Sequence, residues 1–309
     1  MPPAPGAIGV LTQWRPAVVP VLVVVAMVAA YGVGMRAARR AGHRWSDGRA
    51  LVFVALGAGS YGVVTLGFLG VYSPYLRWAF AAQAALLLLV VPPLIALGQP
   101  IQLARKGLGD RARHRLDRVV RSRAARILSH PIGGPTLLLV VLLLFLTPLP
   151  AEVRAHPVAL AAAQIALPLL GLLVVLPVAA GEEPVSSTTM AIAFLIAFLE
   201  LVADAVPGIL LRLHSTVIGA SVHLSSVPTW LPRPLRDQQL SGDVLWFIGE
   251  AIDLPFLAWL VVRWIRADQR EAAAVDARLD AAYDARPWWE VEAERAREAR
   301  RPGHSDNQA

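Results

Sequence analysis

Seven stretches of about 20 mostly apolar residues run through the chain, and this pattern restricts its fold more than any other feature. They cover residues 17–35, 50–71, 79–97, 132–149, 158–180, 190–211 and 244–265. A helix of this length crosses the hydrocarbon core of a bilayer with all its backbone hydrogen bonds made internally. The content of 56% hydrophobic residues is also above that of ordinary soluble domains. The sequence therefore predicts an all-α, polytopic membrane protein, a seven-transmembrane-helix bundle with spans one to seven.

The basic residues lie mainly in alternate loops. They concentrate between spans one and two, between spans three and four, and after span seven, whereas the intervening short loops hold few. Because cytoplasmic loops carry the excess of Lys and Arg, this alternation predicts an outside N-terminus and a cytoplasmic C-terminus. The net charge of +7 thus reflects topology. We expect contact with the lipid bilayer and no nucleic-acid partner.

The chain divides into three predicted segments. Residues 1–15 are expected to form a disordered outer N-terminus, residues 16–266 the seven-helix membrane domain, and residues 267–309 a cytoplasmic tail. The tail begins with a helix-forming segment that continues span seven until Pro287 ends it. Beyond Trp288 and Trp289, high charge and low hydrophobicity predict disorder. Whether these tryptophans contact the membrane or a partner stays open.

Five carboxylic acids lie in or beside the last two apolar spans. Asp243 and Glu250 are seven residues apart and share a helix face, with Asp253 one turn further on. In span six, Glu200 and Asp204 form an i, i+4 pair. Because consecutive spans run antiparallel, we expect these acids to form one intramembrane acidic cluster.

The sequence shows no basic side chain at the depth of this cluster, and the nearest are Arg212 and His214 at the outer end of span six. Acids in such a place must be protonated, bind a cation or contact a water-filled cavity. Two interpretations stay open: hydrogen-bonded packing between helices, or a site for a proton or metal cation. The number of acids favours the site.

Residues that bind transition metals are sparse. There is no cysteine, and the four methionines do not cluster, so copper(I) ligation by soft ligands is not supported. His214 and His223 precede Trp230 in an outward segment, where they are candidate metal ligands for copper(II) or zinc. The alternative is that they are solvated loop or capping residues.

Motifs of common enzymes are also missing from the sequence. It contains no zinc-protease HExxH, no GxSxG nucleophile elbow and no glycine-rich phosphate loop. We therefore predict that the protein is not an enzyme and has no catalytic residues.

Three short motifs follow one another on the seven-span frame. One ends span three, Leu128-Ser129-His130-Pro131 opens span four, and the third begins span seven. With them, the chain resembles the CtaG-like cytochrome c oxidase assembly factors of bacteria over about residues 60–272, as a divergent member of actinobacterial type. In the first and third motifs the residues that carry the resemblance are Pro92, Pro93, Gly98, Pro100, Asp237, Gln238, Gly242 and Trp246.

The resemblance implies a seven-span fold and a role in maturing a haem–copper oxidase by supplying or placing copper in its catalytic subunit. It also implies two histidines in span three, spaced His-x-x-x-His, and a further histidine in span five. The corresponding residues here are Phe80, Ala84 and, by a less direct alignment, Gln164. The family fold carries over, whereas copper delivery by those histidines does not.

We therefore predict a membrane assembly factor for a respiratory haem–copper cytochrome c oxidase in the bacterial plasma membrane, with oxidase subunits as partners. This role could take the form of copper delivery or of scaffolding the catalytic subunit. For copper delivery, the chain lacks the histidines that the family resemblance implies. The alternative is a proton- or metal-cation-coupled transporter that uses the intramembrane acidic cluster. Prolines within spans, such as Pro207 and Pro255, leave this alternative open.

Overall fold

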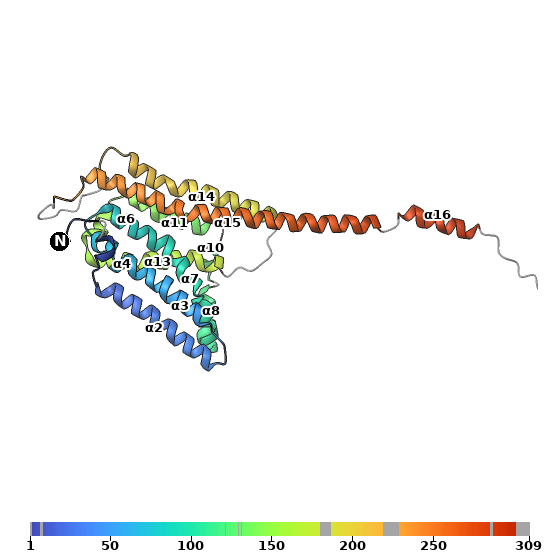
Figure 1. Ribbon diagram of the computed structural model, residues 1–309, viewed down its shortest axis with the longest axis horizontal. Coiled ribbons are helices and arrows are strands. Elements are labelled where there is room, and N and C mark those ends of the chain that lie inside the picture. Colours follow the sequence, from blue (N-terminus) through green and yellow to red (C-terminus); the bar gives the residue numbers. More distant parts are fainter. Residues whose placement is uncertain are drawn as a thin grey trace, which may run out of the picture.

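The computed structural model describes residues 2–6, 9–120, 122–128, 130, 132–179, 187–218, 229–284 and 287–300, and the described chain is helical with no strand. Its helices pack side by side in a bundle from which α15 projects far beyond the others (Figure 1). The elements are α1 (Gly9–Thr12), α2 (Val18–Arg40), α3 (Asp47–Val52), the π-helix η1 (Phe53–Ala58), α4 (Gly59–Leu66), α5 (Phe68–Tyr72), α6 (Arg77–Ala85), the π-helix η2 (Leu86–Val90), α7 (Val91–Leu97), α8 (Pro100–Gly107), α9 (Asp110–Val120), α10 (Arg123–Leu128), α11 (Gly133–Leu143), the 3-10 helix η3 (Leu144–Leu146), α12 (Leu149–Ala155), α13 (Pro157–Ala179), α14 (Ser187–Leu213), α15 (Pro234–Asp284) and α16 (Trp288–Ala299).

Six helical segments of the described chain are long and apolar enough to cross a membrane, and a bent helix pair brings the number to seven. This confirms the predicted all-α membrane fold. The bent pair, Gly133–Leu146 and Leu149–Ala155, turns by 77° at the end of the span predicted over residues 132–149. Pro148 and Pro150 account for this bend, because proline has no N–H for the helical ladder and its ring clashes with the preceding turn.

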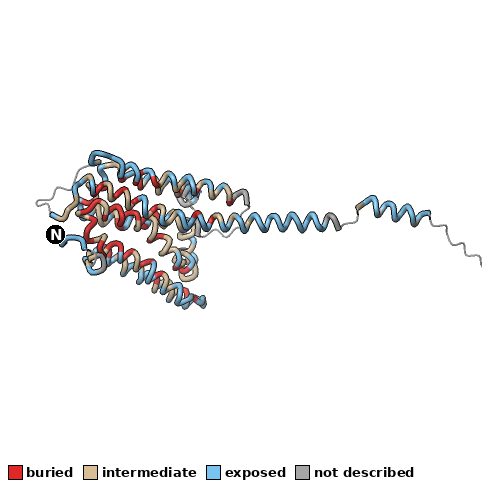
Figure 2. The backbone as a smooth tube through the Cα atoms, turned by 45° about the horizontal axis from the view of Figure 1, so that its top comes forward, coloured by how far each residue is buried: buried red, intermediate tan, exposed pale blue. Residues whose placement is uncertain are grey.

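Span three, formed by α6, η2 and α7, lies at the centre of the bundle. In its apolar window 61% of the residues are buried, against 11% to 39% in the other unbroken spans of the described chain. Figure 2 shows the buried residues gathered inside the bundle. One core cluster joins Phe80 of span three to Phe145 of η3, Leu211 of α14 and Leu245 of α15. Span three is therefore the helix against which the other spans are arranged.

The helix α15 continues well beyond the membrane bundle. It contains 51 residues and is about 75 Å long at 1.5 Å per residue, more than twice the thickness of a bilayer core. Residues 268–281 of this helix are exposed, and Figure 2 shows this projecting part as solvent-accessible throughout. The apolar run and the charged segment after it therefore form one uninterrupted helix.

Both chain ends contain helix where the sequence predicts disorder. Near the N-terminus α1 forms, and the Tyr72 hydroxyl donates a 2.8 Å hydrogen bond to the carbonyl oxygen of Pro3. Near the C-terminus, α16 forms where Glu290 in its first turn and Arg297 in its last turn complement the helix dipole. Residues 301–309, also predicted to be disordered, lie outside the described residues.

The antiparallel helices α14 and α15 approach each other most closely at two glycines, Gly208 and Gly242. A Cβ atom on Gly242 would lie 2.4 Å from the carbonyl oxygen of Gly208 and 2.8 Å from the backbone nitrogen of Arg212. Small residues at such crossings let the backbones of membrane helices pack directly. Gly242 therefore sets the separation of α14 and α15.

We expect Gly242→Ala to destabilise the protein by about 1–3 kcal/mol, because the added methyl group pushes the two backbones apart. The control is Gly249→Ala in the same helix, where an added Cβ meets nothing within 4 Å. That variant should be neutral or slightly stabilising, since alanine favours helix over glycine. Thermal unfolding of both variants in detergent measures the difference, and equal midpoints would contradict this account of the crossing.

Candidate functional site

The side chain of Arg77, the first residue of α6, connects four parts of the fold at one end of the bundle (the Arg77 end). It is 7% exposed. Its Nη1 donates to the carbonyl oxygen of Ile218 at 2.7 Å and to Oε1 of Gln238 at 3.0 Å, and its Nη2 donates to the carbonyl oxygen of Phe145 at 3.0 Å. One guanidinium therefore holds span three, the end of η3, the segment after α14 and the start of α15 together.

Asp237 caps α6 from a different helix. Its carboxylate accepts hydrogen bonds from the backbone N–H groups of Arg77 at 2.8 Å and Trp78 at 3.0 Å. The residue before the helix, Leu76, makes no side-chain capping bond, so the first backbone donors of α6 depend on this distant carboxylate. Asp237 is itself buried, in a position where an unpaired charge would be costly.

Gln238, the next residue in α15, is fully buried and fastens the segment that follows α14. Its Nε2 donates to the carbonyl oxygen of Thr216 at 3.0 Å, and its Oε1 accepts from the backbone N–H of Ile218 at 2.7 Å. The Asp-Gln pair singled out in the sequence thus acts as a fastening between spans three, six and seven.

The motif at the end of span three is likewise a packing feature. Gly98 lies against Phe53, and a Cβ atom added to Gly98 would approach the Phe53 Cβ to 2.6 Å. The carbonyl oxygen of Gly98 accepts a 2.8 Å hydrogen bond from the hydroxyl of Tyr31, which in turn accepts one from Trp45 Nε1 at 3.0 Å. Gln99 adopts a left-handed conformation with φ 53° that reverses the chain into α8.

The three prolines of that motif occupy compatible backbone positions. Pro92 and Pro93 lie in the first turn of α7, directly after η2, and Pro100 is the first residue of α8. Pro100 is tolerated there because its missing N–H would have no intrahelical partner in a first turn. Pro92 and Pro93 follow the π-helix η2 without a break, within the continuous span Arg77–Leu97, where each removes one backbone donor from the helical ladder. This motif therefore ends one helix and starts the next.

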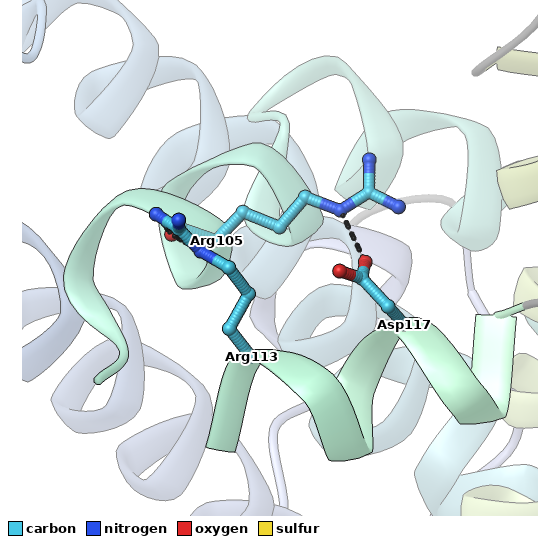
Figure 3. A network of polar contacts seen from close by, with 3 residues as sticks. All are labelled: Arg105, Arg113 and Asp117. Carbon is cyan, nitrogen blue, oxygen red and sulfur yellow. Dashed lines mark hydrogen bonds and ion pairs between the residues drawn. The ribbon is translucent and has the colours of Figure 1, made fainter. Parts of the chain in front are cut away.

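The opposite end of the bundle carries a second polar network on α8 and α9 (Figure 3). Arg105 Nε donates to Asp117 Oδ1 at 2.9 Å, and Arg113 Nε donates to the carbonyl oxygen of Arg105 at 2.9 Å. All three side chains are half-buried between the two short helices. They hold the basic segment after span three in a folded arrangement.

The five predicted acidic residues lie along the seam between α14 and α15, which are packed in extensive contact. Asp243 pairs with Arg212, with its Oδ1 3.0 Å from Arg212 Nε. Arg212, the nearest basic residue noted in the sequence, thus pairs with the outermost acid, because antiparallel packing sets the end of α14 against the start of α15. Glu250 accepts a 3.0 Å hydrogen bond from Trp246 Nε1 one turn away.

The other three acids lie deeper in the seam. Glu200, Asp204 and Asp253 are close enough to interact electrostatically, and Asp253 also interacts with Glu250. Asp204 Oδ1 is buried with no hydrogen-bond partner among the described residues. Below them the seam closes on the apolar side chains of Ala197 and Leu257. Three carboxylic acids therefore lie together in the deeper part of the seam, with no ion pair to a basic residue among the described residues.

The predicted metal-binding histidines do not form a site in the described part of the chain. His214 Nδ1 lies 3.1 Å from the carbonyl oxygen of Thr216 in a local turn, and His223 lies outside the described residues. Among the residues that the structure describes, no group of three or more His, Asp or Glu side chains is arranged to hold a metal ion.

The three positions at which the family resemblance implies histidines are all buried in the bundle. Gln164 of α13 is buried and donates a 3.4 Å hydrogen bond from Nε2 to Oε1 of Gln83, which lies between Phe80 and Ala84 in α6. Gln83 Nε2 donates to the carbonyl oxygen of Val64 at 2.9 Å. The ring of Phe80 packs against Phe145 with centroids 5.8 Å apart. An amide pair and an aromatic pair thus occupy this place, and neither suits copper, which prefers imidazole or sulfur ligands.

Sequence reasoning missed three buried polar residues of the core, Arg77, Gln83 and Arg154. Each lies at the edge of, or within, an apolar run, and each is buried. Arg154 interacts electrostatically with Asp237. The partners of Arg77 are up to 161 residues away in the chain, so no local spacing points to them. The one available signal was the presence of arginines next to spans in loops that are otherwise poor in basic residues.

Comparison with known proteins adds a family match to this geometry. Residues 29–267 match the family described as cytochrome c oxidase caa3 assembly factor (Caa3_CtaG). An uncharacterized protein of Mycobacterium bovis is 28% identical over 296 residues, which cover 92% of this chain and 44% of the relative, and an uncharacterized protein of Mycobacterium tuberculosis gives the same values. The chain thus spans less than half the length of the curated relatives it matches. No solved structure matches it.

We expect Asp237→Ala to destabilise the fold by about 3–5 kcal/mol, since it uncaps α6 and removes the carboxylate beside the buried Arg77. The matched control is Asp243→Ala in the same helix, whose partly exposed ion pair with Arg212 contributes about 0–1 kcal/mol. Thermal unfolding in detergent compares the two. A loss at Asp243 as large as that at Asp237 would contradict the special role of the α6 cap.

Proposed function

Because the chain belongs to the cytochrome c oxidase caa3 assembly factor family, we propose that it acts as a non-catalytic membrane scaffold for an oxidase subunit. The family match, residues 29–267, begins within the first span and extends through the apolar part of the last one, and so covers most of the helical bundle. It is this match that carries the proposal. The relatives are bacterial proteins, and the location we propose is the bacterial plasma membrane, with the N-terminus outside and the C-terminus in the cytoplasm.

Scaffolding is favoured over copper delivery by the interior of the bundle. Gln83 and Gln164 use their amide groups to bind each other and the backbone at the place where the family resemblance implies copper ligands. Neutral amides are poor copper ligands compared with imidazole and thioether groups. The chain's own residues there stabilise the packing of spans three and five.

The face formed by α14 and α15 is the surface that we propose to hold the oxidase subunit. Phe247 is 72% exposed and Trp246 is 45% exposed on this face, with Glu250 hydrogen-bonded to Trp246 beside them. Aromatic side chains supply large contact areas at interfaces, and a polar pair in a membrane gains most when a partner helix covers it. A transmembrane helix of an oxidase subunit could satisfy both requirements.

A transporter for protons or metal cations is the second candidate function, and a specific observation favours it. Asp204 Oδ1 is buried without a partner among the described residues, next to Glu200 and Asp253. Such acids are typical of ion pathways. The broken fourth span and the prolines inside α14 and α15, Pro207 and Pro255, are compatible with the discontinuous helices of transporters.

Deletion of the gene is expected to lower the haem a absorbance and the oxidase activity of isolated membranes several-fold, because the oxidase would assemble without its scaffold. Reduced-minus-oxidised difference spectra and oxygen consumption measure both quantities. Excess copper in the growth medium should not restore activity, and this distinguishes a scaffold from a copper donor. An oxidase of normal activity and copper content in the deletion strain would sink the assembly role.

Complementation with the double variant Glu250→Gln, Asp253→Asn is expected to restore little oxidase activity, although the variant protein accumulates normally. Co-purification of an affinity-tagged chain with oxidase subunits should fall in parallel. Asp243→Asn is the matched control, because Asp243 already has Arg212 as its partner at the end of the seam. Wild-type activity of the double variant would assign these acids to helix packing.

The transporter alternative has its own test in proteoliposomes. Purified protein should not accelerate the decay of an imposed pH gradient if scaffolding is its function. Decay that is faster with the wild type and slow again with Asp204→Asn would instead support proton transport through the seam.

A further inference from the structure

A groove with one cationic end runs between α2 and α13 and is separate from the α14–α15 seam. Its upper part, at the Arg77 end, is a cavity of about 640 Å³, and its lower part is a cavity of about 400 Å³. On three helices a residue that lines the upper cavity is followed closely by one that lines the lower cavity. These pairs are Pro20 and Val23 on α2, Thr65 and Tyr61 on α4, and Gln164 and Ile165 on α13. Because no pair is more than four residues apart, about one helical turn, we treat the two cavities as consecutive parts of one groove.

The upper cavity is lined by two arginines, Arg15 and Arg154, and by no acidic residue. Arg154 is 7% exposed, and its one hydrogen bond in the described chain is from Nε to the carbonyl oxygen of Pro150 at 3.3 Å. Its two terminal nitrogens make no hydrogen bond to another described residue, although the guanidinium interacts electrostatically with Asp237. Asp237, the nearby acid, accepts from two backbone N–H groups and is largely committed to them. This end of the groove suits an anion.

Arg15 is held in place at the mouth of the groove. Its backbone N–H donates a 2.8 Å hydrogen bond to the carbonyl oxygen of Leu66, at the end of α4. It precedes the first apolar span, which begins at Val18, by three residues, so it lies at the level of the lipid headgroups when that span is in a bilayer. An arginine at this level attracts anionic headgroups.

The lower cavity is almost entirely apolar and is long enough for a hydrocarbon chain. It is lined by Val23 and Met27 of α2 and by Ile165 and Leu169 of α13. From Val18 to Gly34 the groove follows about 24 Å of α2. The buried Tyr61 beside it has a hydroxyl with no hydrogen-bond partner among the described residues. An ester carbonyl below a phosphate would be an acceptor for that hydroxyl.

We propose that this groove binds one anionic phospholipid, with its phosphate between Arg15 and Arg154 and an acyl chain between α2 and α13. Charge complementarity at one end and an apolar lining at the other select this occupant over a neutral lipid or a free anion. The lipid joins the least buried span of the bundle, α2, to the remainder. This inference does not depend on the proposed scaffold function, since it uses a different face of the protein.

The test is native mass spectrometry of the full-length protein, purified in mild detergent and titrated with phosphatidylglycerol or with phosphatidylcholine of the same acyl chains. Wild-type protein should bind one phosphatidylglycerol, and phosphatidylcholine several-fold more weakly. Because each arginine near an anionic headgroup contributes about a fivefold change in affinity, Arg15→Gln should weaken binding about fivefold and Arg15→Gln with Arg154→Gln about 30-fold.

The control is Arg233→Gln with Arg236→Gln, which removes the same charge from exposed positions at the same end of the bundle and should leave binding unchanged. Ala161→Phe narrows the upper cavity while keeping both arginines, and should also abolish binding. This variant and Arg15→Gln keep the test valid if loss of the buried Arg154 prevents folding. Equal binding of the two lipids, unchanged binding in Arg15→Gln or Ala161→Phe, or displacement of the lipid by millimolar inorganic phosphate would overturn the proposal.

Discussion

The buried guanidinium of Arg77 is the interaction on which the arrangement of the spans depends. It donates to η3, to the segment after α14 and to Gln238 of α15, while the neighbouring Asp237 caps the helix that Arg77 begins. Both of its terminal nitrogens are paired, whereas its Nε is buried with no hydrogen-bond partner among the described residues. Removing the partners of a buried charge costs on the order of 3–5 kcal/mol, so these contacts favour the observed position of span three against its neighbours.

The short motifs that carry the family resemblance contribute to this packing. Asp237 and Gln238 connect three spans through hydrogen bonds, and Gly242 allows the backbones of α14 and α15 to pack directly. The carbonyl oxygen of Gly98 accepts a hydrogen bond from Tyr31, and Gly98 packs against Phe53. Family membership thus explains the fold more directly than the function. The groups that packing leaves unsatisfied, the deep acids of the α14–α15 seam and the arginines of the α2–α13 groove, are where binding is to be sought.

Part of the candidate site followed from the sequence. Helical spacing placed Glu200 with Asp204, and Glu250 with Asp253, on faces that meet because adjacent spans are antiparallel. The pairing of Asp243 with Arg212 was not predicted, although Arg212 was noted as the nearest basic residue, since the offset of two helices along their axes depends on contacts such as Gly208 with Gly242 and not on periodicity. The bend at the end of span four was not predicted either, although Pro148 and Pro150 were its local signal.

The sequence by itself determined the class of the protein, because an apolar run of about 20 residues has one stable form in a bilayer, a helix that satisfies its own backbone. It also determined the family, through motifs whose spacing is local. Only the tertiary structure decided what those motifs do and which polar groups meet. Arg77 finds Gln238 161 positions away, and Gln164 finds Gln83 across 81, because the energy of a buried polar group depends on the neighbours that the whole bundle brings to it.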